Sequence, residues 1–196
     1  MSTERTESAV GAGRRVALYG GSFDPPHNAH VLAVTWLLCR AHVDAVWLLP
    51  TYAHAFGKTL APFDERVAML RLAMAHLGPQ VAVEPIEATL AQPSYTVQTV
   101  DALREREPGA RFTWLMGTDS FAERERWHQF ERLESMVDFL LVGRDGQPDP
   151  EGVEVPVHLP AIASSDVRRR LRAGQPVAHL LPEAVYAHID QRGLYR

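Results

Sequence analysis

The stretch 16–38 constrains the fold of this chain more than any other segment. A short apolar run, 16–19, leads into Gly20 and Gly21, and a second apolar run begins at Val31. This order predicts a β-strand, a glycine turn and a helix. Glycines let a backbone approach an anion closely, and the first N–H groups of a helix point at it. The stretch therefore predicts an α/β fold with an anion site at the start of its first helix.

Strand and helix patterns continue to alternate along the rest of the chain. Strands are expected at 15–19, 43–49, 81–83, 112–116 and 137–142. Helices are expected at 28–40, 64–77, 95–107, after a second glycine turn at 117–120, at 164–172, and from Pro182 to about Gly193. Such alternation is typical of a Rossmann-like, doubly wound parallel sheet with helices on both faces. We expect a single domain over residues 14–196, preceded by a flexible tail over 1–13.

Three segments that suit ligand binding should meet at one edge of this sheet. Ligands of doubly wound sheets bind outside the carboxyl ends of the strands, where the strand order reverses. The segments 20–30, 117–120 and 164–168 each follow a strand or begin a helix there. Helix caps are expected at Asp64, at Ser94 and at Ser164 or Ser165. The irregular stretch 51–63 is expected to form an ordered loop.

Composition excludes several classes of protein. The net charge of −4 argues against broad electrostatic binding to nucleic acid. No apolar run approaches the roughly 20 residues of a membrane helix, so no membrane partner is expected. The single cysteine, Cys39, is expected in the core, and one cysteine forms no internal disulfide. This cysteine usage suits the cytoplasm. The sequence does not distinguish a monomer from a homodimer.

His27 and His30 lie on one face of the first turn of the first expected helix. They do not match the H-E-x-x-H pattern of metalloproteases, and the sequence offers no evident third ligand, so we expect no protein-bound metal. The plain alternative is a pair of partly buried histidines. Beside a glycine turn, both imidazoles are well placed to donate hydrogen bonds to phosphate oxygens.

Ser164, Ser165 and Arg168 form a second candidate phosphate site. Arg168 follows the expected helix cap by one turn, near the serine hydroxyls and the first N–H groups of that helix. Arginine suits phosphate because it can donate two parallel hydrogen bonds. The alternative is an ordinary cap followed by a solvated basic helix face.

Two further positions have a functional and a structural interpretation. Trp127, beside His128, offers a flat surface on which an aromatic ring could stack, but tryptophans more often anchor a loop to the core. Lys58 lies in the loop after Pro50, where it could face an anion or simply be solvated.

The chain lacks the patterns of the common nucleotide folds. Neither G-x-x-x-x-G-K-[ST] nor G-x-G-x-x-G occurs in it. Two phosphate-binding helix ends without an obvious catalytic base suit a reaction in which an already ionised phosphate attacks another phosphate. Catalysis then consists of positioning and charge neutralisation.

With these residues in view, the chain resembles the nucleotidyltransferases of the H-x-G-H type, and among them the bacterial nicotinate-nucleotide adenylyltransferases. The resemblance covers nearly the whole chain after the tail. The matching segments are G-G-S-F-D-P-P-H at 20–27 with His30, S-Y-T at 94–96, G-T-D-S at 117–120, W-H at 127–128, I-A-S-S-D-V-R at 162–168 and G-L-Y at 193–195.

The resemblance implies transfer of AMP from ATP to nicotinate mononucleotide, with Mg²⁺ carried on the ATP phosphates. It implies that His27, His30 and Arg168 stabilise the transferring phosphates. The implied ATP-binding residues are Gly21, Ser22, Phe23, Gly117, Asp119, Ser164 and Ser165. The implied residues for the mononucleotide are Lys58, Thr96, Trp127 and His128.

The chain departs from the pattern of this family in three places. Ala29 stands where the family usually has glycine, Ala163 replaces a serine, and the loop 51–58 lacks the common P-H-K pattern. Two alternatives stay open: an adenylyltransferase for nicotinamide mononucleotide or phosphopantetheine, and a non-catalytic nucleotide sensor. Phosphopantetheine enzymes are shorter and usually have Thr or Ser at the position of His27.

Overall fold

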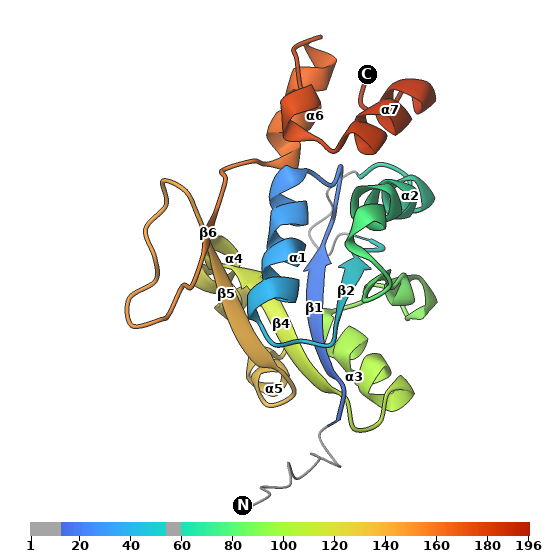
Figure 1. The fold of residues 1–196 in the computed structure, drawn as a ribbon. Coiled ribbons are helices and arrows are strands. Elements are labelled where there is room, and N and C mark those ends of the chain that lie inside the picture. Colours follow the sequence, from blue (N-terminus) through green and yellow to red (C-terminus); the bar gives the residue numbers. More distant parts are fainter. Residues whose placement is uncertain (1–12, 54–59) are drawn as a thin grey trace, which may run out of the picture.

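A computed structural model describes residues 13–53 and 60–196 (Figure 1). Its centre is a parallel sheet with the strand order β3-β2-β1-β4-β5-β6. The strands are β1 (Arg15–Gly21), β2 (Ala45–Pro50), β3 (Val81–Val83), β4 (Arg111–Gly117), β5 (Asp138–Arg144) and β6 (His158–Leu159). From β1 the chain adds β2 and β3 on one side of the sheet, and it then crosses to the other side to add β4, β5 and β6. The predicted doubly wound fold is therefore confirmed, and the switch point lies between β1 and β4.

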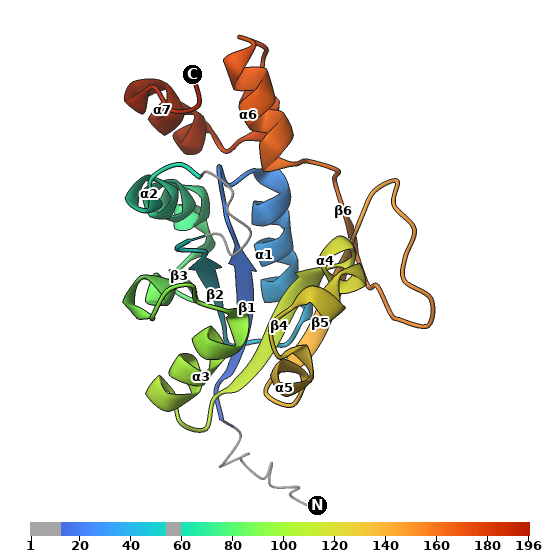
Figure 2. The same ribbon diagram turned by 180° about the vertical axis from the view of Figure 1, so that it is seen from behind.

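Helices cover both faces of this sheet (Figures 1 and 2). The α-helices are α1 (Asn28–Arg40), α2 (Phe63–Met74), α3 (Thr96–Arg106), α4 (Thr118–Ala122), α5 (Phe130–Glu134), α6 (Ser164–Arg172) and α7 (Glu183–Arg192). Short 3-10 helices lie at Ala75–Leu77, Ile86–Thr89, Arg124–Arg126 and Ala178–Leu180.

Each face of the sheet has its own core, because side chains alternate along a strand. From β1, Ala17 packs with α1, α2 and α7 on one face. Val16 and Leu18 pack with α3 and α5 on the other. All six residues of β2 are buried, as expected for a central parallel strand.

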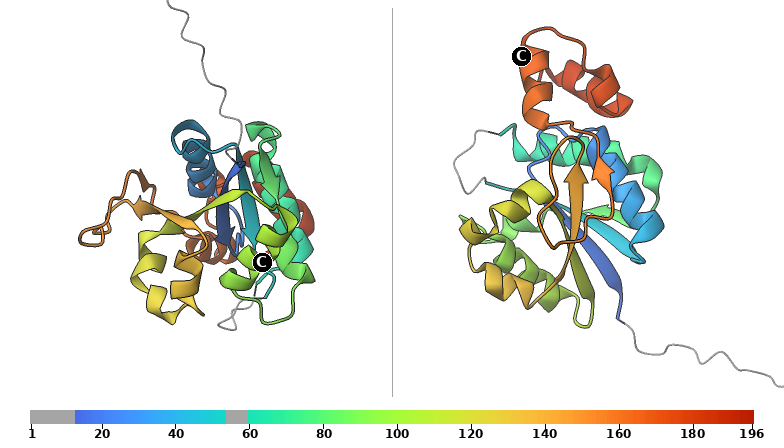
Figure 3. Two further views of the ribbon diagram at one scale, coloured as in Figure 1. Left: turned by 90° about the horizontal axis from the view of Figure 1, so that it is seen from below. Right: turned by 90° about the vertical axis from the view of Figure 1, so that its left-hand side faces the viewer.

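The C-terminal helices lie beyond the carboxyl ends of the strands, as Figures 1 and 3 show. The helix α7 is held to α2 through Glu65, which pairs with His188 at 2.7 Å and with Arg192 at 2.8 Å. The side chain of Asn28, at the start of α1, donates a hydrogen bond to the carbonyl of His179. The end of the chain is thereby fastened over the edge where ligands are expected.

Several element boundaries differ from those predicted. Pro62 rather than Asp64 is the N-cap of α2, which begins at Phe63. Tyr95 rather than Ser94 is the N-cap of α3, because the buried Ser94 hydroxyl donates to Glu87 instead. Ala163 is the N-cap of α6, which begins at Ser164. Pro50 is the last residue of β2 rather than its stop signal.

The prediction for Cys39 was wrong. Its side chain is exposed, because the buried stripe of α1 runs through Ala29, Ala33, Val34 and Leu37 and leaves position 39 on the outer side. The expectation of burial rests on the apolar neighbours of Cys39 in sequence. In a helix, however, burial depends on which face a residue occupies.

The predicted tail 1–13 lies outside the described residues apart from Gly13, which packs against the backbone of Gly109. Among the helices of the described ranges, none has the length and apolar character needed to cross a membrane.

Candidate active site

The loop from Ser22 to His27 joins β1 to α1 at the switch point of the sheet. Gly20, just before this loop, has to be glycine, because a Cβ atom there would come within 2.5 Å of the Trp114 ring. A Cβ atom at Gly21 would lie 3.2 Å from the ring of Phe23. Phe23 itself is buried and has a φ of 47°, a left-handed conformation that is costly for an aromatic residue. Tight ring packing therefore sets the shape of this loop.

The two histidines of the motif are brought together as predicted. Their rings are stacked, with centroids 3.7 Å apart and planes inclined by 23°. The backbone N–H of His27 donates to Nδ1 of His30 at 3.1 Å. Because Nδ1 of His30 accepts this bond, the neutral ring carries its proton on Nε2. The Phe23 ring contacts His30 edge-on, with centroids 5.0 Å apart, and so supports its orientation.

Burial keeps both imidazoles neutral. His27 is only 5% exposed, and its Nδ1 has no hydrogen-bond partner among the described residues. Burial, with a smaller contribution from the charge of Arg144, lowers the pKa of His27 from 6.5 to about 4. Burial, then the nearby His27 and Arg144, also lowers the pKa of His30 well below its usual value. At neutral pH the pair therefore consists of uncharged rings.

The start of α6 docks directly on this first loop. The Ser164 hydroxyl donates to the carbonyl of Pro25 at 2.9 Å. Nη1 of Arg168 donates to the carbonyl of Asp24 at 2.6 Å. These partners are 139 and 144 residues apart in sequence, and the predicted convergence of two helix ends is present. Ser165 is exposed, on the outer side of the same turn.

The second glycine turn lies next to this loop. Gly117 ends β4, and a Cβ atom there would come within 2.6 Å of the Asp119 carboxylate. Asp119 accepts a hydrogen bond from the backbone N–H of Ser120 and pairs with Arg144 at 3.5 Å. Arg144 was missed in the sequence. The available signal was its position at the carboxyl end of β5, the same edge that carries the other candidate residues.

The residues expected to receive the mononucleotide form a separate group. Thr96 is the first residue of α3, and the preceding Tyr95 stacks on His128, with ring centroids 4.4 Å apart. Trp127 is half-buried and meets Trp114 and Phe130 edge-on, so it is anchored in the core as the structural interpretation expects. Lys58 lies outside the described residues.

Arg66 and Glu87 hold the backbone on either side of residues 54–59. Arg66 is 1% exposed and donates to the carbonyls of Ser22, Tyr52 and Ala61. The carboxylate of Glu87 accepts from the backbone N–H of Tyr52 at 3.0 Å. Sequence reasoning missed both. For Arg66 the signal was an arginine on the buried side of α2, four residues before Leu70.

The arrangement is suited to an oligophosphate. Two helix starts, two imidazoles and the Arg168 guanidinium surround one short loop, and all of them stabilise negative charge. Within residues 13–53 and 60–196, no group of three His, Cys, Asp or Glu side chains could hold a metal ion.

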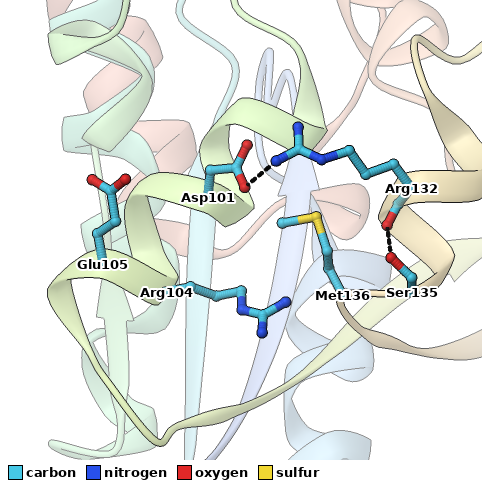
Figure 4. A pocket seen from close by; sticks show the side chains of 6 residues that line it. All are labelled: Asp101, Arg104, Glu105, Arg132, Ser135 and Met136. Carbon is cyan, nitrogen blue, oxygen red and sulfur yellow. Dashed lines mark hydrogen bonds and ion pairs between the residues drawn. The ribbon is translucent and has the colours of Figure 1, made fainter.

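A concavity of about 400 Å³ lies elsewhere, at the amino-terminal edge of the sheet between α3 and α5 (Figure 4). An Asp101–Arg132 ion pair of 2.7 Å crosses it, and Arg104, Glu105, Ser135 and Met136 line the rest. It contains none of the candidate site residues.

Comparisons with known proteins agree with this geometry. Residues 18–170 match the Cytidylyltransferase-like family. A protein of Anaeromyxobacter dehalogenans named "Probable nicotinate-nucleotide adenylyltransferase" is 42% identical, over 95% of this chain and 100% of the relative. A relative of the same name from Myxococcus xanthus is 34% identical, over 92% of this chain and 94% of its own length.

A solved structure shares the fold. The Plasmodium falciparum nicotinic acid mononucleotide adenylyltransferase in complex with NaAD superimposes with a TM-score of 0.78 at 18% identity, covering 93% of this chain and 97% of the other. Together, the match along most of the chain and the identity to full-length relatives place this protein among the nicotinate-nucleotide adenylyltransferases of the cytidylyltransferase-like family.

Proposed function

We propose that this chain transfers AMP from ATP to nicotinate mononucleotide, forming nicotinate adenine dinucleotide and pyrophosphate in NAD biosynthesis. The observation that carries the proposal is the meeting of α1 and α6 at the Ser22–His27 loop, where Ser164 and Arg168 bond to its carbonyls. The relatives named for this reaction cover nearly the whole chain.

The reaction needs no general base. A phosphate oxygen of the acceptor, already ionised at neutral pH, attacks the α-phosphorus of ATP. A new P–O bond forms, and the bond from that phosphorus to the bridging oxygen breaks, so its electron pair leaves with pyrophosphate. Positioning and neutralisation of charge supply the catalysis.

The two histidines act as uncharged donors in this scheme. His30 carries its proton on Nε2. Nδ1 of the buried His27 has no hydrogen-bond partner among the described residues, so it is free to form a hydrogen bond with a ligand. Both rings donate to oxygens of the transferring phosphate. A bound polyphosphate raises the pKa of both imidazoles and strengthens these bonds as charge develops.

The remaining roles follow from position. Arg168 and Ser164 hold the β- and γ-phosphates, with Ser165 at the rim. Gly21, Ser22 and Phe23, at the start of the Ser22–His27 loop, also bind ATP. Gly117 and Asp119 contact the adenosine. We assign the carboxylate of the mononucleotide to the start of α3 at Thr96 and to His128, with Trp127 behind. Lys58 lies outside the described residues, and its expected role in binding the mononucleotide stays a prediction.

A divalent cation enters with the nucleotide in this proposal. The carboxylate of Asp24, buried beside the loop, is already engaged by Tyr195, Ala61 and Arg168. Mg²⁺ keeps several waters and is usually bound through substrate phosphates, so we assign it to ATP rather than to a cage of side chains. The chemistry it supplies is neutralisation of phosphate charge. We also propose that the reaction takes place in the cytoplasm, which the single cysteine supports.

The test is pyrophosphate release from Mg-ATP with purified protein. Nicotinate mononucleotide should be consumed much faster than nicotinamide mononucleotide or phosphopantetheine. His30→Ala should abolish turnover while circular dichroism stays unchanged, and His76→Ala, an exposed histidine far from the site, should leave turnover intact. A preference for another acceptor would replace the substrate proposed here. ATP binding without any turnover would identify a nucleotide sensor instead.

A further inference from the structure

The carboxylate of Asp24 lies at the centre of contacts between distant parts of the chain. Its side chain is 0% exposed. Oδ1 accepts from the Tyr195 hydroxyl at 2.7 Å and from the backbone N–H of Ala61 at 3.1 Å. Oδ2 lies 3.4 Å from Nη1 of Arg168 and has no hydrogen bond among the described residues. A buried charge of this kind is costly unless it is paired.

Asp24 holds Arg168 at two points. Its backbone carbonyl accepts a hydrogen bond from Nη1, and its carboxylate faces the same nitrogen. The neighbouring arginines behave differently, since Arg169 and Arg170 both pair with Asp166 on the outer side of α6. Arg168 is thus the arginine of α6 that turns inward, and Asp24 is what it turns toward.

Tyr195 brings the last residues of the chain into this contact. Tyr195 lies shortly after the end of α7 and has a φ of 64°, which is the left-handed conformation. From this position its hydroxyl donates to the Asp24 carboxylate. Burial, then the adjacent Asp24 carboxylate, raises the pKa of Tyr195. The hydroxyl therefore remains protonated and continues to donate at physiological pH.

We infer that Asp24 is a positioning residue that orients Arg168 toward the ATP phosphates, and that Tyr195 completes this arrangement from the C-terminus. The inference rests on the proposed function, because it assumes that Arg168 binds ATP. It adds a role for the end of the chain: the Tyr195 hydroxyl directs the carboxylate, and the carboxylate directs the guanidinium.

A double-mutant cycle tests the inference through the Kd for ATP, measured by calorimetry. Asp24→Asn should weaken ATP binding about tenfold, the size of one charge-assisted hydrogen bond. In the Arg168→Ala background the same change should have almost no further effect, because the residue being positioned is absent. An equal loss of affinity in both backgrounds would show a general structural role and overturn the inference.

Tyr195→Phe provides a second route if Asp24→Asn does not fold. It removes one hydroxyl and keeps the ring, so ATP affinity should fall by roughly threefold to tenfold. The KM for nicotinate mononucleotide should stay unchanged, and the effect should again vanish with Arg168→Ala. Tyr186→Phe, on the exposed side of α7, is the matched control. Unchanged ATP affinity in Tyr195→Phe would remove Tyr195 from the arrangement and overturn that half of the inference.

The double-mutant cycle and the test of the proposed reaction can fail independently of each other. If the wild type binds ATP but forms no dinucleotide, the proposed function fails while the cycle still reports whether Asp24 acts through Arg168. If turnover is normal and the cycle shows no coupling, the proposed function stands and this inference fails.

Discussion

The phosphate end and the acceptor end of the site are built in different ways. The proposed phosphate end is formed by the Ser22–His27 loop and the starts of α1 and α6, and its buried or half-buried groups His30, Ser164 and Arg168 each have a hydrogen-bond partner. The proposed acceptor end, formed by Thr96, Trp127 and His128, includes the exposed ring of His128, which stacks on the half-buried Tyr95 before α3. If these residues act as proposed, the comparison teaches that the groups for the chemistry are held in place by packing before ATP binds, whereas the groups for the acceptor lie nearer the surface.

The largest expected effect belongs to the phosphate end. His27→Ala should lower kcat on the order of 100- to 1,000-fold, because a preorganised donor to the transferring phosphate is lost. The loss should be similar for every acceptor that the enzyme accepts. Steady-state kinetics with two mononucleotides measures it, and a loss confined to one of them would assign His27 to acceptor recognition.

A smaller effect should appear in stability at acid pH. The folded protein takes up a proton on His27 only near pH 4, whereas the unfolded chain does so near 6.5. Unfolding therefore takes up a proton between these values, and the free energy of unfolding should fall as the pH drops from about 6.5 toward 4, by about 3 kcal/mol. The contribution is fully present above pH 6.5.

Urea unfolding of the wild type and of His27→Gln at several pH values measures this dependence. The substitution should flatten the slope between pH 4 and 6.5, and His76→Gln serves as the control. Equal slopes in wild type and His27→Gln would mean that the His27 ring titrates normally in the fold.

At the acceptor end, His128→Ala should raise the KM for nicotinate mononucleotide about tenfold and leave kcat nearly unchanged. The reason is that this ring, stacked on Tyr95, is proposed to contact the acceptor equally in the ground state and the transition state. A fall in kcat with KM unchanged in His128→Ala would mean that His128 acts in the chemical step, so that the two ends of the site would not have separate roles.

The smallest expected effect concerns Arg144. Its charge helps to lower the pKa of His27 and His30, although burial is the larger cause. Arg144→Gln should therefore raise the pKa of both rings without restoring the usual value. Histidine NMR titration of the protein without ATP would show this, and Arg132→Gln, remote from the site, is the matched control.

Local patterns predicted much of this molecule because they depend on neighbours in sequence. The glycines and the HxxH pair lie within one or two turns of the groups that they contact. Predictions failed where a distant partner intervened. Ser94 did not cap α3 because Glu87 takes its hydroxyl, and Cys39 faces outward because the packing of α1 on the sheet decides its orientation.

The sequence by itself determined the order of the first five strands and most helices, the glycine turn with His27 and His30, and the second segment with Arg168. It did not predict β6 or the division of the chain after Gly117 into α4 and α5. Apolar periodicity and turn chemistry act over a few residues, so they can be read along the chain. Only the tertiary structure decided that Asp24 meets Arg168 and Tyr195, that Arg66 binds three carbonyls in two loops, and that Arg144 influences the histidines. These contacts join residues far apart in sequence, and the pairing of parallel strands across the switch point is what brings them together.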